Sequence, residues 1–128
     1  MKFREFILKS GTKIFLGKDA KNNDKLVKKF RGKGNVIIHT VASGSPFCVI
    51  ENLNPTKEEI KEAGIICASK SQDWRDNKSN IKIDIFTGKD VKKTIFMETG
   101  SWRLRNKPKA LNIDKKDIKS WEREHKKR

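Results

Sequence analysis

GIICASKSQDWRDNKSNIKIDIFTGKDVKK, residues 64–93, carries the clearest secondary-structure signals of the chain. It begins as the end of a helix of small residues, passes through a polar elbow into an alternating strand, and ends in a basic turn. Isoleucines at positions 81, 83 and 85 alternate with Lys82, Asp84 and Phe86, which is the period of a half-buried strand. Basic residues gather at both ends of this strand, namely Lys70, Arg75 and Lys78 before it and Lys89, Lys92 and Lys93 after it. These two basic groups at opposite ends of one strand, with Trp74 beside the first, predict a surface that meets phosphates.

Further strands are predicted on both sides of this stretch. Residues 3–9 and 12–16 are β-prone runs joined by a Ser-Gly turn, which favours a hairpin. Residues 36–41 form a near-continuous apolar run typical of a central strand, and residues 47–50 follow a Gly-Ser-Pro turn as another strand. Residues 90–97 and 101–105 predict two more strands, and residues 110–113 are expected to pair back on the second of these.

Two internal helices and a C-terminal helix complete the expected architecture. The first helix lies within residues 17–30, with one apolar stripe and an N-cap at Asn22 or Asn23. The second begins where Thr56 and Glu59 fit a capping box. The last starts at Asp114 and either docks through an apolar face that contains Ile118 and Trp121 or continues the helix of a partner.

The predicted fold class is α+β. We expect a single compact domain with a mostly antiparallel or mixed sheet of about seven strands, two packed helices and a C-terminal helix. Residues 1–113 are expected to form the domain and residues 114–128 the basic C-terminal helix. At 128 residues, such a domain buries roughly two thirds of the surface of its unfolded chain.

Composition favours a polyanionic partner. Lys and Arg number 31 against 16 Asp and Glu, which gives a formal charge of +15, and nucleic acid is the commonest partner of a compact basic domain. No apolar run of about 18 residues is present, so no membrane insertion is expected. Cys48 and Cys67 lie far apart in apolar surroundings and outside any CxxC pair, which predicts reduced, buried side chains in a cytoplasmic protein. No metal or other cofactor is expected.

Two residues have both a structural and a functional interpretation. His39 follows an apolar run, so it is either a satisfied strand histidine or a general acid or base. Trp74 either fills the edge of the core or offers a ring on which a base stacks. The chain contains no nucleophile elbow and no Gly-x-x-x-x-Gly-Lys-Ser/Thr loop, so acyl transfer and nucleotide hydrolysis have no support.

The order of motifs resembles the NFACT-R domain family, whose members include ribosome-associated quality-control factors and small stand-alone homologues. The resemblance runs through GKDAKNND, IIHT, GSPFCVI, an Ala-containing helix that ends in SKSQDWRDNKSNIKIDIFTGKDVKK, and ETGSWRL. The matching residues are Gly17, Lys18, Asp19, Asn23, Asp24, His39, Thr40, Gly44, Ser45, Ser69, Lys70, Asp84, Val91, Lys92, Lys93 and Gly100. They span nearly the whole chain in the order of the family pattern.

The resemblance implies an RNA-binding domain that helps the large factors engage the large ribosomal subunit and tRNA. The chain departs from the family pattern at two places, and roles that depend on the family residues there cannot be assigned to it. Many members have His after Gly-Ser where this chain has Pro46, and the family's Val-Asp-Tyr-Thr is Ile-Asp-Ile-Phe at residues 83–86. The helix-hairpin-helix regions and the long coiled coil of the large factors are not in this sequence, so we do not expect it to support tRNA recruitment or tail addition by itself.

We therefore predict a cytoplasmic, non-enzymatic module that recognises structured rRNA or tRNA, with the large ribosomal subunit as a partner. The residues expected to bind RNA are Lys18, Lys21, Asn23, His39, Ser45, Lys70, Trp74, Arg75, Lys89, Lys92 and Lys93. Lysines and arginines would contact phosphates, and Trp74 would stack on a base. The alternatives are a DNA-binding module, as in a stand-alone animal relative, and an RNA-processing enzyme that uses His39. The oligomeric state stays open.

Overall fold

The computed structural model describes residues 2–40, 42, 44–92 and 103–125. Its elements in chain order are β1 (Arg4–Ile7), β2 (Lys13–Leu16), α1 (Ala20–Phe30), β3 (Val36–Thr40), β4 (Phe47–Ile50), α2 (Lys57–Ser69), α3 (Gln72–Asp76), β5 (Ile81–Thr87), a 3-10 turn η1 (Gly88–Asp90), β6 (Val91–Lys92), β7 (Arg103–Leu104), β8 (Lys109–Ile113) and α4 (Lys115–His125). The strand residues predicted at 93–97 and 101–102 lie outside the described residues.

The main sheet has six strands in the order β1-β2-β4-β3-β5-β8, and every neighbouring pair in it is antiparallel. A second, two-stranded ribbon pairs β6 with β7. The predicted α+β class with a mostly antiparallel sheet is confirmed, as is the internal position of β3.

The expected partner of the last strand was wrong. Residues 109–113 pair with β5, in a register that sets Ile113 opposite Ile81, and do not pair back on the strand at 103–104. Both of these isoleucines are buried on the face of the sheet that α2 covers. Burial of this apolar pair therefore stabilises the β5–β8 register.

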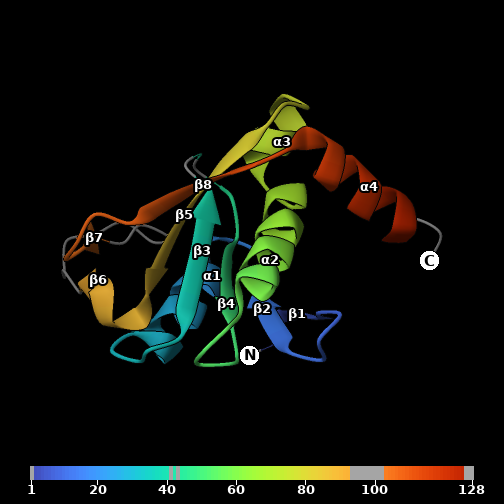
Figure 1. The fold of residues 1–128 in the computed structure, drawn as a ribbon. Helices are drawn as coiled ribbons and strands as arrows, with labels where there is room; N and C mark the ends of the chain where they lie inside the picture. The colour runs from blue at the N-terminus through green and yellow to red at the C-terminus, as the bar shows by residue number, and fades with distance from the viewer. Residues whose placement is uncertain (1, 41, 43, 93–102, 126–128) are drawn as a thin grey trace.

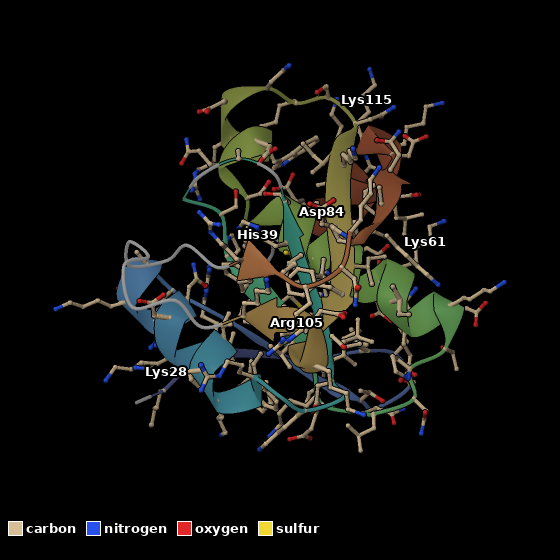
Figure 2. The ribbon with its side chains drawn as sticks, turned by 90° about the vertical axis from the view of Figure 1, so that its left-hand side faces the viewer. Lys28, His39, Lys61, Asp84, Arg105 and Lys115 are labelled. Atoms are coloured by element: carbon tan, nitrogen blue, oxygen red, sulfur yellow. The ribbon has the colours of Figure 1, made fainter. Side chains whose placement is uncertain are left out.

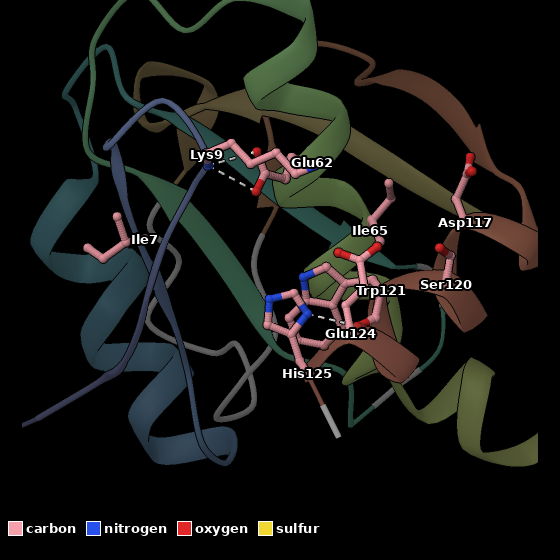
Figure 3. A pocket seen from close by; sticks show the side chains of 9 residues that line it. All are labelled: Ile7, Lys9, Glu62, Ile65, Asp117, Ser120, Trp121, Glu124 and His125. Atoms are coloured by element: carbon pink, nitrogen blue, oxygen red, sulfur yellow. Dashed lines mark hydrogen bonds between the residues drawn. The ribbon is translucent and has the colours of Figure 1, made fainter. Parts of the chain in front are cut away.

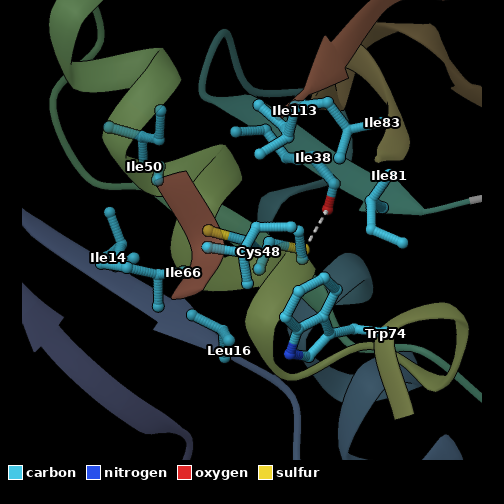
Figure 4. Close-up of a cluster of buried hydrophobic side chains, with 14 of the residues drawn as sticks. Ile14, Leu16, Ile38, Cys48, Ile50, Ile66, Trp74, Ile81, Ile83 and Ile113 are labelled. Atoms are coloured by element: carbon cyan, nitrogen blue, oxygen red, sulfur yellow. Dashed lines mark hydrogen bonds between the residues drawn. The ribbon is translucent and has the colours of Figure 1, made fainter. Parts of the chain in front are cut away.

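Helices cover both faces of the sheet. Figure 1 shows α2 and α4 on one side and α1 on the other. Because successive strand residues point to opposite faces, the sheet separates two clusters of buried side chains. The first lies under α2 and contains Ile38, Cys48, Ile83 and Trp74 among others (Figure 4). The second lies under α1.

Strand β5 is buried on more than one face. Ile81 and Ile83 belong to the first cluster, as the alternation predicted. Phe86, predicted to be on the solvent side, is 7% exposed and packs in the second cluster with Phe30 and Val91. The half-buried interpretation therefore fails at this end of the strand, because α1 and the turn after β5 cover it.

The helix starts follow local capping chemistry. Thr56 and Glu59 form the predicted capping box at α2. Helix α1 is instead capped by Asp19, whose side chain accepts the backbone N–H of Asn22 at 2.8 Å. The expected cap at Asn22 or Asn23 was wrong, because both asparagines lie within the first turn and their side chains bind neighbouring loops.

Helix α4 docks on the domain, which is the first of the two alternatives expected for it. Ile118 is fully buried in the first cluster, and Trp121 packs against it. The polar elbow forms the short helix α3, capped by Ser71. Cys48 and Cys67 are buried and free, as predicted. In the part of the chain that the structure describes, no helix is both long and apolar enough to cross a membrane.

Candidate nucleic-acid interface

A small polar cavity of about 90 Å³ lies where the start of α1 meets β1, the loop before β4, the C-terminal end of α2 and α3. We call it the basic pocket. The residues that line it are Arg4, Gly17, Lys18, Asp19, Asn23, Gly44, Pro46, Lys70 and Arg75. Three of its four cations, from Lys18, Lys70 and Arg75, were predicted to bind RNA, and the fold brings them together from distant parts of the sequence.

Arg4 is the cation of the basic pocket that the sequence analysis missed. It lies on the same side of β1 as Phe6 and Leu8, since alternate residues of a strand share a face, and Leu8 is buried in the first cluster. The signal in the sequence that could have identified Arg4 is therefore its position on the same face of the strand as a core residue. Its Nη2 donates to the carbonyl oxygen of Gly17 at 2.7 Å.

The Arg4 guanidinium is left with an unmet hydrogen-bond donor. Its Nε is buried and has no hydrogen-bond partner among the described residues. Burial lowers the pKa of Arg4, and the positive charge of Arg75 acts in the same direction. A buried donor without a partner costs about 1–3 kcal/mol, and two like charges repel. An anion in the pocket would offset the repulsion between the charges of Arg4 and Arg75.

Two asparagines at the start of α1 hold the wall of the basic pocket. Asn22 Oδ1 accepts the backbone N–H of Lys18 at 2.9 Å. Asn23 Oδ1 accepts the N–H of Phe47 at 3.0 Å, and its Nδ2 donates to the carbonyl oxygen of Ser45 at 3.3 Å. The helix start and the loop before β4 are thereby tied to each other, although 22 residues separate Asn23 from Ser45.

A second network ties that loop to α3. The hydroxyls of Thr40 and Ser45 donate to Asp73 Oδ1 at 2.8 and 3.2 Å, and Ser45 Oγ accepts the N–H of Gln72 at 3.0 Å. Asn23 and Ser45, both predicted to bind RNA, are 5% and 2% exposed. With their polar groups bound to the protein, they shape the pocket and offer little to a ligand.

Lys70 at the C-terminal cap of α2 and Arg75 within α3 both line the basic pocket. Arg75 is exposed, and its guanidinium donates to Gln72 Oε1 at 2.8 Å and to the carbonyl oxygen of Lys70 at 3.3 Å. Ion pairs join Lys13 to Glu5 and Lys61 to Asp117, and these two involve no cation of the pocket. The lining of the pocket combines four cations with one carboxylate, from Asp19, so it has an excess of positive charge.

Trp74 does not provide a stacking surface, so that prediction was wrong. The ring is 1% exposed and belongs to the first cluster (Figure 4). Its Nε1 donates to Glu122 Oε1 of α4 at 3.1 Å, and Lys78 Nζ lies 4.8 Å from the ring centroid. The turn of α3 directs the indole into the core, which the other interpretation of this residue anticipated.

His39 lies on the sheet outside the basic pocket. Its ring stacks on that of Phe47 with centroids 4.0 Å apart and planes inclined by 8°. Burial lowers the pKa of His39, against smaller effects of a backbone hydrogen bond with Ser45 and of the Asp84 carboxylate. The imidazole is therefore neutral near pH 7. Among the described residues, no group of three His, Cys, Asp or Glu side chains is placed to hold a metal ion.

The remaining predicted cations lie apart from the basic pocket. Lys21 is exposed on α1, and Lys89 and Lys92 are exposed beyond the end of β5, while Lys93 lies outside the described residues. Figure 2 shows that basic side chains project from many elements, including Lys28 on α1 and Lys61 on α2. Net charge by itself therefore does not locate a site on this molecule.

The chain is similar to proteins of one known family. A family model described as "NFACT protein RNA binding domain" matches residues 2–106. The chain is 31% identical over 119 residues to the "Ribosome quality control complex subunit NEMF homolog" of Drosophila melanogaster, which covers 86% of this chain and 12% of that protein. It is 29% identical over 68 residues to the "Archaeal Rqc2 homolog aRqcH" of Methanocaldococcus jannaschii, which covers 52% of this chain and 10% of that protein.

A solved structure shares the fold. The C-terminal part of the fibronectin/fibrinogen-binding protein from Streptococcus suis matches with a TM-score of 0.79 and 27% sequence identity, over 94% of this chain and 49% of that one. The chain thus spans about half of this solved structure and an eighth or less of the length of the two curated relatives.

Proposed function

The chain belongs to the NFACT RNA-binding domain family, and on that premise we propose that it is a non-enzymatic RNA-binding module that holds a backbone phosphate in the basic pocket. The observation that carries the proposal is the gathering of four cations at one small pocket, which Arg4, with a buried Nε that has no partner among the described residues, lines together with Lys18, Lys70 and Arg75. A phosphate oxygen is the acceptor that such a guanidinium binds best.

The size and charge of the basic pocket suit one phosphate group. A cavity of about 90 Å³ has room for a few water molecules or a single tetrahedral anion, and is too small for a nucleobase with its sugar. Lys18 and Arg75 are exposed at the pocket, so they would reach the oxygens that stay in solvent. Phosphate contacts set position and affinity without reading sequence, so selectivity would come from RNA shape.

We further propose structured RNA of the ribosome or tRNA as the target, in the cytoplasm and in ribosome quality control. The name of the relative from Drosophila melanogaster supports this setting, since it refers to a ribosome quality control complex. Lys21, Lys89, Lys92 and Lys93 would contact phosphates beyond the pocket. His39 would lie beside the bound strand, next to the loop that forms one wall of the pocket.

Filter binding to a structured RNA tests the pocket. Lys18→Gln combined with Arg75→Gln is expected to weaken affinity about tenfold and to lower the slope of log K against log salt by about one. Lys57→Gln combined with Lys115→Gln removes the same charge from exposed positions on α2 and α4 and is the matched control. Equal affinities and equal salt slopes for the two double variants would overturn the assignment of the pocket.

Two further measurements define the target. Duplex DNA that competes as well as the structured RNA at the same salt concentration would replace RNA by DNA as the ligand. Sedimentation of the tagged protein through a sucrose gradient of cell lysate, with and without RNase, tests the ribosome as partner. We expect RNase-sensitive migration with the large subunit, and a protein that stays at the top of the gradient would contradict that partner.

A further inference from the structure

Lys70 of the basic pocket is held by aromatic rings from two other elements. Its Nζ lies 5.5 Å from the ring centroid of Trp121 on α4 and 5.9 Å from that of Phe6 on β1. These are cation–π distances, and the two rings meet edge to face with centroids 6.1 Å apart. A lysine side chain without such contacts samples many rotamers, so the rings restrict where this ammonium group lies.

Trp121 is itself fixed in the structure. Its ring stacks on His125, one helical turn later, at 4.2 Å and 19°, and His125 Nδ1 lies 2.8 Å from the carbonyl oxygen of Trp121. Figure 3 shows these two rings together at a cavity of about 300 Å³, which Glu62 and Ile65 of α2 also line. The indole is therefore a rigid support for Lys70.

Helix α4 also contacts residue 74, near the C-terminal end of the 70–75 segment that contributes Lys70 and Arg75 to the pocket. Glu122, next to Trp121, accepts the hydrogen bond from Trp74 Nε1 at 3.1 Å, and Ile118 anchors the helix in the core. Trp74 precedes Arg75 directly in the chain. Helix α4 thus contacts the ammonium group of Lys70 and the side chain of the residue next to Arg75.

We propose that Trp121 is a positioning residue for nucleic-acid binding, because α4 holds Lys70 at the basic pocket through this ring. The proposal rests on the proposed function of the pocket. It assigns the C-terminal helix, which contributes no side chain to the lining of the pocket, a part in setting the affinity for phosphate. Helix α4 would therefore both cover the core and position Lys70 for phosphate binding.

A double-mutant cycle on RNA affinity tests this role. Trp121→Leu is expected to raise the dissociation constant about threefold when Lys70 is present and to leave it unchanged in a Lys70→Gln background. Trp121→Phe keeps a ring and is expected to retain most of the affinity. Thermal unfolding of all variants provides the structural readout, since a packing defect lowers stability in both backgrounds alike.

The outcomes separate the two proposals. Loss of affinity by the same factor in both backgrounds, or no loss in either, would overturn the positioning role of Trp121. A wild-type protein that fails to bind any structured RNA would overturn the proposed function first. Should Trp121→Leu fail to fold, Phe6→Leu removes the other ring beside Lys70, and the same cycle with Lys70→Gln decides the question.

Discussion

Replacing Gly17 by alanine tests whether the Asn23 side chain holds the loop of the basic pocket. A Cβ at position 17 would lie 1.8 Å from Asn23 Oδ1 and 3.0 Å from Asn23 Cα. The backbone of Gly17 is outside the left-handed region, so alanine has no conformational penalty of its own there. The asparagine side chain must therefore move, and the effect of the substitution reports on its hydrogen bonds.

The expected cost follows from those bonds. Displacement of Asn23 breaks its hydrogen bonds with the N–H of Phe47 and the carbonyl oxygen of Ser45, both in buried surroundings. Two lost hydrogen bonds, with the buried N–H of Phe47 left unpaired, cost about 3 kcal/mol of unfolding free energy. For a chain of this length, that corresponds to a fall in Tm of roughly 10 °C.

Urea unfolding and thermal unfolding measure this cost. Gly34→Ala is the matched control, because a Cβ there meets nothing closer than 4.0 Å and the residue has no positive φ. We expect the control to change the unfolding free energy by less than about 0.5 kcal/mol. A Gly17→Ala protein as stable as Gly34→Ala would refute the role assigned to Asn23.

Three further predictions concern titratable groups. Hydrogen bonds, chiefly from the hydroxyl of Thr12, lower the pKa of Glu59 to about 2, so the stability it contributes is present above the ordinary pKa of 4.5 and is lost as the pH falls toward 2. Glu59→Gln should therefore flatten the acid limb of stability in urea unfolding, and an unchanged limb would contradict this. Burial lowers the pKa of His39, so its imidazole should titrate below 6.5 by NMR, and protonation should destabilise the fold as the pH falls through that value. Burial raises the pKa of Cys48 and raises that of Cys67 to about 12, so neither thiol should react with Ellman's reagent until guanidinium unfolds the protein, and rapid reaction of the native protein would be inconsistent with their burial.

Local sequence patterns predicted the parts of the fold that local interactions stabilise. The alternating isoleucines of β5 and the capping box of Thr56 and Glu59 both involve residues within four positions of one another, and both are present. The N-cap of α1 was missed because Asp19, Asn22 and Asn23 are all good caps. Loops remote in sequence bind the two asparagines, which leaves Asp19 at the cap.

Contacts between elements distant in the sequence decide whether an aromatic residue is buried and which strand pairs with β8. Trp74 in a polar elbow fits both a core edge and a stacking surface, and its hydrogen bond to Glu122, 48 residues later, accompanies burial in the core. The partner of β8 was likewise unpredictable from its own residues, because a short strand pairs with whichever edge lets it bury its apolar side. In this chain that edge is β5, where Ile113 meets Ile81.

The sequence by itself established the α+β class, the basic character of the chain, the start of α2 and the family resemblance. Periodicity, charge and the order of motifs can all be read along the chain without knowledge of tertiary contacts. Tertiary structure alone assembled the basic pocket. The four cations Arg4, Lys18, Lys70 and Arg75 come from β1, the turn before α1, the C-cap of α2 and the short helix α3. Only the strand order and the docking of α1 and α2 on opposite faces bring them to one cavity. The physical reason is that such proximity follows from burial of the apolar faces, which the cations themselves do not encode.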